Sequence, residues 1–263
     1  MKYSKFVLFA ITLMLIAGGI SSCGNSASDE IKKVIETAND QCPVIYETGV
    51  VTGFDVDEDN KMIVVNYEID DEKYKISTIK EDKSKLENIC RLLFLENVSQ
   101  ADKNLVNTIV NLGYGIRYVF KCFKSQEKIA VNFSKERLST NKPLTIEENV
   151  KTNVDFAKLS LPLMLDSVTN MVDVDIVKDT LFYIYEVDEK LCPMSTLENK
   201  VKDNITFGIS EQFRNNSSAG EFFKNVCKSG RGLCYRYKGN TTGKIVDINY
   251  DNTKLRQMAN AVN

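Results

Sequence analysis

Residues 113–121, GYGIRYVFK, and residues 230–238, GRGLCYRYK, are the two stretches that decide how this chain folds. In each stretch two glycines flank a single residue, and aromatic side chains follow three and five positions after the second glycine. Both stretches close on a lysine, Lys121 and Lys238. A glycine at this place is typical of a helix end, and the alternating aromatic residues predict a strand directly after it. The same local structure is therefore predicted at two places in the chain.

Matching residues continue on both sides of these stretches, at separations of 116 to 119 residues. Pro43 matches Pro162, and the run Ile63–Ile69 matches the run Leu181–Val187. The other matched pairs are Asp55 with Asp173, Asp57 with Asp175, Glu68 with Glu186, Ile129 with Val246, and Val131 with Ile248. Because the matches keep the same order over about a hundred residues, they predict one unit used twice. The boundary near residues 141–143 gives repeat domains at 29–140 and 141–263.

Each copy shows the same order of helical and strand patterns. In the first copy, apolar residues recur at helical spacing over 31–38, 86–94 and 101–112. Alternating apolar residues predict strands over 63–69, 116–122 and 129–133. In the second copy, Thr145 and Glu148 form a capping box at the start of the first helix. The predicted unit is α-β-β-α-α-β-β, an antiparallel sheet with helices on one face, which belongs to the α+β fold class.

The composition excludes several kinds of function. The chain has 263 residues, with 34 Lys and Arg against 36 Asp and Glu, so it lacks the positive charge that a nucleic-acid partner requires. It has no histidine, which excludes a Ser-His-Asp triad, a Cys-His dyad and the common histidine metal sites. We therefore expect no cofactor, no metal site and no nucleic-acid partner.

Two motifs that suggest ligand binding have simpler explanations. The acidic run 55–60 resembles a calcium loop, but Asn60 and Asn66 stand where that loop requires Gly and Glu. We interpret it as a solvated turn between two strands. The glycine pairs at Gly113 and Gly230 follow a helix and precede a strand, the reverse of the order in a dinucleotide-binding loop. We interpret them as helix ends.

The N-terminus has the pattern of a targeting signal. Lys2 and Lys5 precede an apolar run over 6–17, which is too short to span a bilayer. The sequence Ile20-Ser21-Ser22-Cys23 then resembles a bacterial lipobox. That resemblance implies a signal peptide over 1–22, lipidation of Cys23 and a tether over 23–28. Residue 24 is Gly rather than Asp, so the resemblance implies the outer membrane, on its periplasmic or surface face, rather than retention in the inner membrane.

Other residues are candidates for covalent modification. Cys227 and Cys234 are close enough in sequence for a disulfide, which an exported protein permits, but the spacing leaves open whether they are bridged or free. Cys90 and Cys122 lie on apolar faces and are interpreted as core thiols. Asp166-Ser167-Val168 and Asp179-Thr180-Leu181 resemble the O-glycosylation motif of exported Bacteroidetes proteins, which implies Ser167 and Thr180 as acceptors.

The duplicated unit, with a proline after its first helix and a later Tyr-Glu-aliphatic strand, resembles uncharacterised exported proteins of Bacteroidetes. That resemblance implies no activity. Our first hypothesis is a non-enzymatic lipoprotein of the cell envelope that is held at the membrane by its lipid and binds an unknown protein or small ligand, or serves as a scaffold. The alternative is an Asp/Glu-dependent hydrolase of envelope or dietary glycan. No Asp or Glu stands in a context that singles it out as catalytic.

Overall fold

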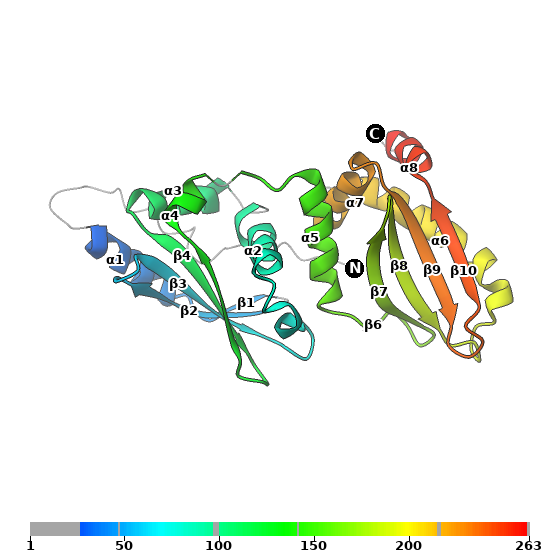
Figure 1. Cartoon of the computed structure of the whole chain (residues 1–263), viewed down its shortest axis with the longest axis horizontal. Helices are drawn as coiled ribbons and strands as arrows, with labels where there is room; N and C mark the ends of the chain where they lie inside the picture. Colours follow the sequence, from blue (N-terminus) through cyan, green and yellow to red (C-terminus); the bar gives the residue numbers. More distant parts are fainter. Residues whose placement is uncertain (1–26, 47, 97–99, 141, 215–216, 262–263) are drawn as a thin grey trace. The chain divides into compact units, whose positions relative to one another are not determined.

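The computed structural model describes residues 27–46, 48–96, 100–140, 142–214 and 217–261. The chain divides into two compact units between Pro143 and Leu144 (Figure 1). We call residues 27–143 the N-terminal unit and residues 144–261 the C-terminal unit, and describe each by itself. Cys23 and the expected signal peptide lie outside the described residues.

The N-terminal unit alternates helices with the strands of one sheet. Its helices are α1 (Ala27–Asn39), α2 (Lys83–Arg91), α3 (Gln100–Asn111) and α4 (Lys135–Ser139), with a 3-10 turn η1 (Ile76–Ile79) and a π-helical turn η2 (Leu92–Glu96). Its strands are β1 (Val44–Tyr46), β2 (Gly49–Asp57), β3 (Met62–Ile69), β4 (Gly115–Cys122) and β5 (Lys128–Phe133). Helix α1 begins at Ala27, so the expected tether over 23–28 is too long by two residues. Asp29 and Glu30 in its first turn favour a helix start at this place.

The C-terminal unit repeats this arrangement. Its helices are α5 (Ile146–Lys158), α6 (Met194–Arg214), α7 (Ser218–Lys228) and α8 (Asn252–Asn260). Its strands are β6 (Leu163–Met164), β7 (Thr169–Val177), β8 (Thr180–Val187), β9 (Gly232–Gly239) and β10 (Ile245–Tyr250). The capping box of Thr145 and Glu148 is present at the start of α5, as predicted.

Each unit contains one five-stranded sheet. The strand orders are β1-β2-β3-β4-β5 and β10-β9-β8-β7-β6, and the two orders correspond strand for strand. The α+β fold class with two sheet-and-helix halves is confirmed. The β2–β3 and β7–β8 hairpins are also interrupted at matching places, with a register shift between Val51 and Gly53 in one and between Met171 and Asp173 in the other. The short first strands β1 and β6 were not predicted.

The sheets are mixed, which corrects the expected antiparallel arrangement. Strand β3 pairs with β4 in parallel, with Ile63 opposite Ile116, and β8 pairs with β9 in parallel, with Leu181 opposite Leu233. The cause is the connection between the paired strands. The helices between β3 and β4, or between β8 and β9, carry the chain back to the end of the sheet where the previous strand began, so the next strand runs in the same direction.

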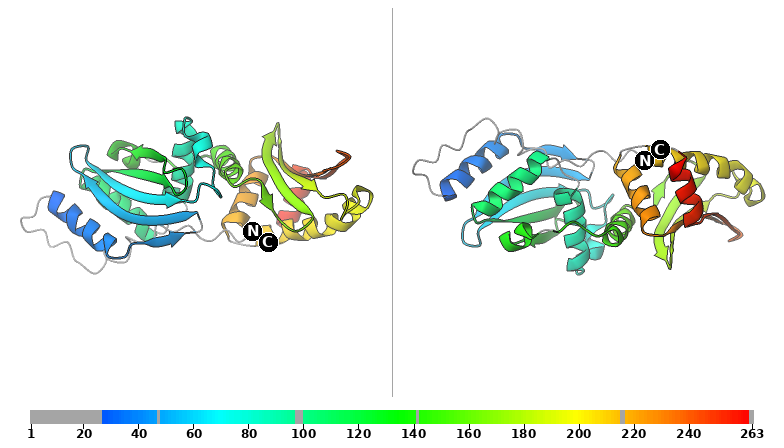
Figure 2. Two further views of the ribbon diagram at one scale, coloured as in Figure 1. Left: turned by 90° about the horizontal axis from the view of Figure 1, so that it is seen from below. Right: turned by 90° about the horizontal axis from the view of Figure 1, so that it is seen from above.

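Helices cover one face of each sheet, as predicted. In β3 the side chains of Ile63, Val65 and Tyr67 are buried, whereas Val64, Asn66 and Glu68 between them are half-exposed. On the buried side, Phe94 of η2 stacks on Tyr118 of β4 with ring centroids 4.7 Å apart. In the C-terminal unit, residues of α5, α6, α7 and α8 join the strands in one apolar core, and Figure 2 shows α6 and α7 together on one side of the strands.

The turns between helix and strand use glycine, as the sequence predicted. Gly113 and Gly230 have φ of +89° and +82°, a backbone conformation that favours glycine, and each follows the end of a helix. The prolines matched between the copies, Pro43 and Pro162, both follow a cis peptide bond. Beside β2, Asn39 at the end of α1 uses its side-chain amide to pair with the backbone of Phe54, donating to the carbonyl at 2.8 Å and accepting from the N–H at 2.7 Å.

Candidate functional site

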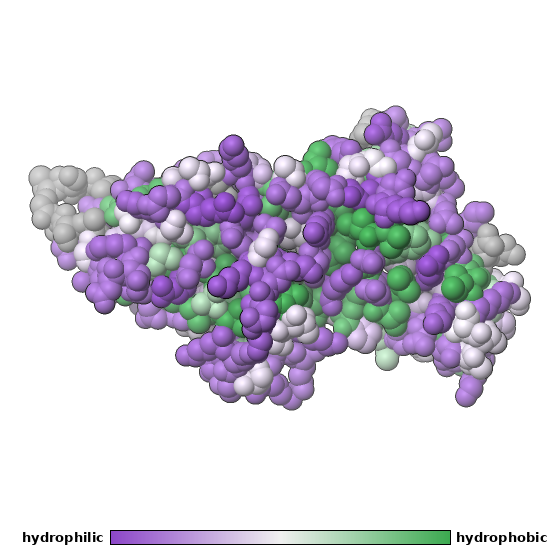
Figure 3. Space-filling view, viewed as in Figure 1, coloured by the Kyte–Doolittle hydropathy of each residue, from purple (hydrophilic) through white to green (hydrophobic). Residues whose placement is uncertain are grey.

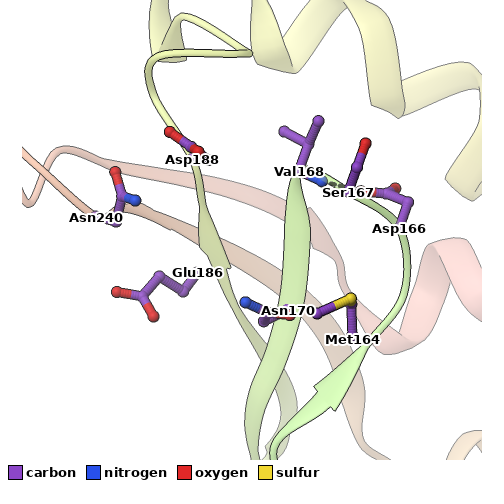
Figure 4. A pocket seen from close by; sticks show the side chains of 8 residues that line it. All are labelled: Met164, Asp166, Ser167, Val168, Asn170, Glu186, Asp188 and Asn240. Atoms are coloured by element: carbon purple, nitrogen blue, oxygen red, sulfur yellow. Dashed lines mark hydrogen bonds between the residues drawn. The ribbon is translucent and has the colours of Figure 1, made fainter.

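A hollow of about 200 Å³ lies at one end of the sheet of the C-terminal unit. Figure 4 shows its lining, with Glu186 and Asn240 on one side and Met164 and Asp166 on the other. The lining residues come from β6, β7 and β8 and from the loops that follow β6, β8 and β9. They are Met164, Asp166, Ser167, Val168, Asn170, Glu186, Asp188 and Asn240. The hollow therefore lies where the ends of three strands meet the three loops that follow β6, β8 and β9.

The β6–β7 turn forms one wall of the hollow. The Asp166 carboxylate accepts hydrogen bonds from the backbone N–H of Val168 at 2.8 Å and of Thr169 at 2.7 Å, which fixes an Asx turn. The N–H of Leu165 also donates to the carbonyl of Thr169 at 2.9 Å. These bonds close the turn tightly and leave the side chain of Ser167 exposed at its tip.

Backbone hydrogen bonds hold the second wall against the first. The N–H of Asp188 donates to the carbonyl of Val168 at 2.9 Å, and the N–H of Asn240 donates to the carbonyl of Val187 at 3.0 Å. The Asp188 carboxylate accepts from the N–H of Lys190 at 3.0 Å. Asp166 and Asp188 are therefore oriented by the backbone of their own loops.

The charge of the lining is negative, since it contains three carboxylates and neither lysine nor arginine. Glu186 differs from the other two acidic lining residues because its carboxylate has no hydrogen bond or ion pair among the described residues. In the N-terminal unit the matching residue, Glu68, is paired with Lys121 at 3.1 Å.

The sheet register shows that the two glutamates occupy equivalent positions, each opposite a lysine of the neighbouring parallel strand. Glu68 lies opposite Lys121 in one parallel strand pair, and Glu186 lies opposite Lys238 in the other. The same two residue types thus form an ion pair in the N-terminal unit and leave the glutamate unpaired beside the hollow in the C-terminal unit. The hollow has a carboxylate that is available to a ligand.

The arrangement can accept hydrogen bonds and attract positive charge. Among the described residues, no group of three or more Cys, Asp or Glu side chains is placed to hold a metal ion. The lining includes no lysine, cysteine or tyrosine to act as a nucleophile, and the only hydroxyl is that of Ser167. A glycosidase needs two carboxyl groups converging on one bond, and Asp166 and Asp188 are instead engaged with backbone amides.

The structure places the acidic run 55–60 at the end of β2 and in the β2–β3 turn, where three of its four carboxylates, those of Asp55, Asp57 and Glu58, have side-chain partners. Asp57 pairs with Arg117 at 2.8 Å. Glu58 accepts hydrogen bonds from Ser28, from the Tyr114 hydroxyl at 2.6 Å and from Lys61 at 3.1 Å. These bonds, that from Ser28 first, lower the pKa of Glu58 to about 2. Residues 58–60 of the run form a hairpin turn, as interpreted from the sequence, whereas residues 55–57 belong to β2.

The disulfide considered between Cys227 and Cys234 is not formed, since both thiols are free. Cys227, near the end of α7, packs in the apolar core together with Leu233 and Tyr237 of β9. Side chains alternate along a strand, so Cys234 points to the opposite face of the sheet. The two thiols therefore lie on different sides of β9. Both are buried, as are Cys90 and Cys122, which were interpreted as core thiols.

The two candidate O-glycosylation sites differ in exposure. Ser167 is exposed on the rim of the hollow, whereas Thr180 is half-buried as the first residue of β8. Modification of either residue stays a prediction.

The hollow was not predicted from the sequence. Ser167 was expected as a modification site and Glu186 as a repeated acidic residue, whereas Asn170, Asp188 and Asn240 were not expected at a site. One signal was present, because Asp188 and Asn240 directly follow the last residues of β8 and β9. Polar residues that directly follow neighbouring parallel strands lie at the same edge of a sheet.

The fold and the hollow define a protein of two α+β units, with a polar, acidic recess in the C-terminal unit. No protein-family model matches the chain, and no curated protein matches it. Among solved structures, the chain is similar to a Pseudomonas aeruginosa protein described as a candidate secreted protein, with 10% sequence identity and a TM-score of 0.33. That match covers 42% of this chain and 93% of the other. No helix in the described ranges is both long enough and apolar enough to cross a bilayer.

Proposed function

We propose that the protein is a non-catalytic binding protein of the cell envelope, anchored by a lipid on Cys23, and that its hollow binds a small cationic amine. The observation that carries the ligand class is the unpaired carboxylate of Glu186 in a lining without lysine or arginine. A volume of about 200 Å³ favours a small ligand or the end of a longer one. The exposed Met164 beside Asn170 offers apolar contact to the carbon chain of such an amine.

The expected affinity is weak, because the recess is open to solvent. Ion pairs between exposed groups contribute roughly 1 kcal/mol or less, which corresponds to at most about a fivefold change in affinity. Screening by salt should weaken the binding further, since the Debye length shortens to about 8 Å at physiological ionic strength. Specificity then comes from the oriented acceptors of Asp166 and Asp188 acting together with Glu186.

The test is a nuclear magnetic resonance titration of the isotopically labelled chain from residue 24 onward with spermidine at low salt. We expect the backbone amides of Asn170, Asp188 and Asn240 to shift, and Glu186→Gln to weaken binding by up to about fivefold. Glu68→Gln is the matched control, because it removes the same charge at the same strand position of the N-terminal unit and should leave binding unchanged. Shifts confined to residues outside the hollow, or equal effects of both variants, would exclude the proposed site.

The anchor is tested separately. The unaltered protein should fractionate with membranes and carry acyl mass on the peptide that begins at Cys23. Cys23→Ala should lack that mass and leave the membrane fraction, whereas Cys42→Ala should retain both properties. A Cys23→Ala variant that stays in the membrane fraction, together with an unacylated wild type, would contradict the proposed localisation.

A further inference from the structure

Beside the hollow, the carboxylate of Glu189 accepts hydrogen bonds only from the β9–β10 turn among the described residues. Glu189, which follows Asp188, accepts hydrogen bonds from the N–H of Thr241 at 2.8 Å, the N–H of Thr242 at 2.6 Å and the hydroxyl of Thr242 at 2.7 Å. In return, its own N–H donates to the side-chain oxygen of Asn240 at 3.3 Å. The β8–α6 connection is thus fastened to the β9–β10 turn from both directions.

Gly239 makes room for this carboxylate. A Cβ atom at position 239 would lie 2.6 Å from each carboxylate oxygen of Glu189, closer than atoms can approach. The position is buried, so the carboxylate packs directly against the backbone of the last residue of β9. The absence of a side chain at Gly239 therefore allows the Glu189 carboxylate to reach the turn.

The N-terminal unit has a carboxylate with the same hydrogen-bonding role at the matching place, although Cys122 stands there in place of the glycine. Asp71 follows β3 and accepts hydrogen bonds from the N–H of Lys124 at 2.8 Å and of Ser125 at 3.0 Å, in the β4–β5 turn. The fold thus uses an acidic residue in both units to hold the closing hairpin. In the C-terminal unit the adjoining residues, Asp188 and Asn240, line the hollow.

We infer that Glu189 is the positioning residue of the hollow. Its carboxylate fixes the turn that carries Asn240, and its backbone fixes the connection that carries Asp188, so both rim residues depend on the same group. Oriented polar groups bind better when neighbouring hydrogen bonds hold them in place. The effect of Glu189 on ligand binding rests on the proposed function. Its hydrogen bonds to the turn do not depend on that proposal.

The first test compares Glu189→Ala with Asp71→Ala in the chain from residue 24 onward. Both variants should lower the stability of their own unit, because each frees two turn amides. Only Glu189→Ala should also weaken spermidine binding, by about as much as Glu186→Gln does. Glu189→Gln, which keeps an acceptor oxygen, should restore part of the binding. Unchanged binding in Glu189→Ala, while the wild type binds in the hollow, would overturn the inference and leave the proposed function standing.

The second test needs no ligand. Hydrogen bonds from the turn amides lower the pKa of Glu189, so the amide proton shifts of Thr241 and Thr242 should follow a titration below the usual range of glutamate near 4.3. The titration should vanish in Glu189→Ala, and the amide resonance of Asn240 should move in that variant. If the proposed function fails, these signals still decide the inference, and an Asn240 resonance that stays in place would overturn it.

The third test uses the steric relation to Gly239. Gly239→Ala should move the Asn240 and Thr241 resonances strongly in the wild-type background. In the Glu189→Ala background the same change should move them little, because the group that the new Cβ meets is gone. Equal effects in the two backgrounds would show that Glu189 does not hold the rim through this contact.

Discussion

At the scale of single residues, Gly115 and Gly232 show how closely the strands approach one another. The N–H of Gly115 donates to the carbonyl of Lys61 at 2.8 Å, and the N–H of Gly232 donates to the carbonyl of Asp179 at 2.9 Å. A Cβ at Gly232 would lie 2.7 Å from the carbonyl oxygen of Tyr250. A Cβ at Gly115 would lie 2.7 Å from the sulfur of Met62 and closer still to the carbonyl oxygen of Phe133. Each glycine thus allows the parallel strand pair to start beside the end of the closing hairpin.

Gly115→Ala should therefore destabilise the N-terminal unit. Overpacking of this kind costs roughly 1–3 kcal/mol of unfolding free energy. Urea unfolding followed by circular dichroism measures the loss. Gly208→Ala in α6 is the control, because no atom lies within 4 Å of the added Cβ. There the substitution should stabilise the chain by up to about 1 kcal/mol. A Gly115→Ala variant as stable as the wild type would mean that the strands separate easily at this point.

Both glycines of each pair were interpreted from the sequence as part of a helix end, and this explanation holds only for the first glycine. Gly113 and Gly230 were interpreted correctly as helix ends, since a positive φ is a local property. The second glycine of each pair is required by a carbonyl that lies far away in the sequence, at Phe133 or Tyr250. The disulfide hypothesis failed for a related reason, because the side of β9 on which Cys234 lies depends on which face the helices cover.

At the scale of secondary-structure elements, the closing hairpin of the N-terminal unit depends on the ionised form of Asp71. Backbone hydrogen bonds from Lys124 and Ser125 lower the pKa of Asp71 to about 2. The unfolded chain binds a proton at this residue near pH 3.9. A depressed carboxyl pKa stabilises the fold above the unfolded value, and this stabilisation is lost as the pH falls from about 4 toward 2.

Asp71→Asn should accordingly lower stability at pH 7, and the difference from the wild type should shrink as the pH falls from about 4 toward 2. Urea midpoints at pH 7, 4 and 2.5 measure this change. Glu72→Gln serves as the control, since the Glu72 carboxylate pairs with Lys124 at the surface and exposed pairs contribute little. A stability difference between Asp71→Asn and wild type that does not vary with pH would show that the carboxylate is not held in its ionised form.

The order of the elements could be predicted from periodicity, but their pairing could not. The alternation of Ile63, Val65 and Tyr67 is visible in the sequence because one face of β3 is buried. The relative direction of β3 and β4 depends on the path of the helices that connect them. The residues of the two strands do not by themselves indicate this direction. Strands β1 and β6 contain three and two residues, too few to show any alternation.

At the scale of the whole molecule, each unit has its own sheet and its own buried core. Among the described residues, the buried residues of the C-terminal core cluster run from Val150 to Leu255. Figure 3 shows charged and polar residues over much of the visible surface, with apolar residues gathered in places. Two cores formed from separate stretches of chain predict separate cooperative transitions.

Hydrogen exchange measures this separation directly. Gly115→Ala should speed exchange in β3 and β4 and leave β8 and β9 unchanged, and Gly232→Ala should have the reverse effect. The two variants control for each other, because they make the same change at matching positions. Faster exchange in both sheets after either substitution would show that the chain unfolds as one cooperative body.

The hollow illustrates what sequence alone leaves open at this scale. Met164 and Asn240 line the same recess although long stretches of helix and strand separate them in the chain. Their proximity depends on the full strand order and on the turn that Glu189 holds. The matched sequence positions predicted the strands, but the difference between the two units, an ion pair at Glu68 and an unpaired Glu186, needed the structure.

Each unit contains one half-buried and two buried cysteines, so the opening of each unit can be followed by the chemical modification of its own thiols. Cys42 in the N-terminal unit and Cys192 in the C-terminal unit are half-buried, whereas Cys90 and Cys122 in the first unit and Cys227 and Cys234 in the second are buried. Burial also raises the pKa of Cys90, and that of Cys234 to about 11, which keeps these sulfurs protonated and slow to alkylate. A short pulse of iodoacetamide should mark Cys42 and Cys192 first. During heating, mass spectrometry of the buried pairs would then tell which half of the protein opens earlier, with no probe introduced into the sequence.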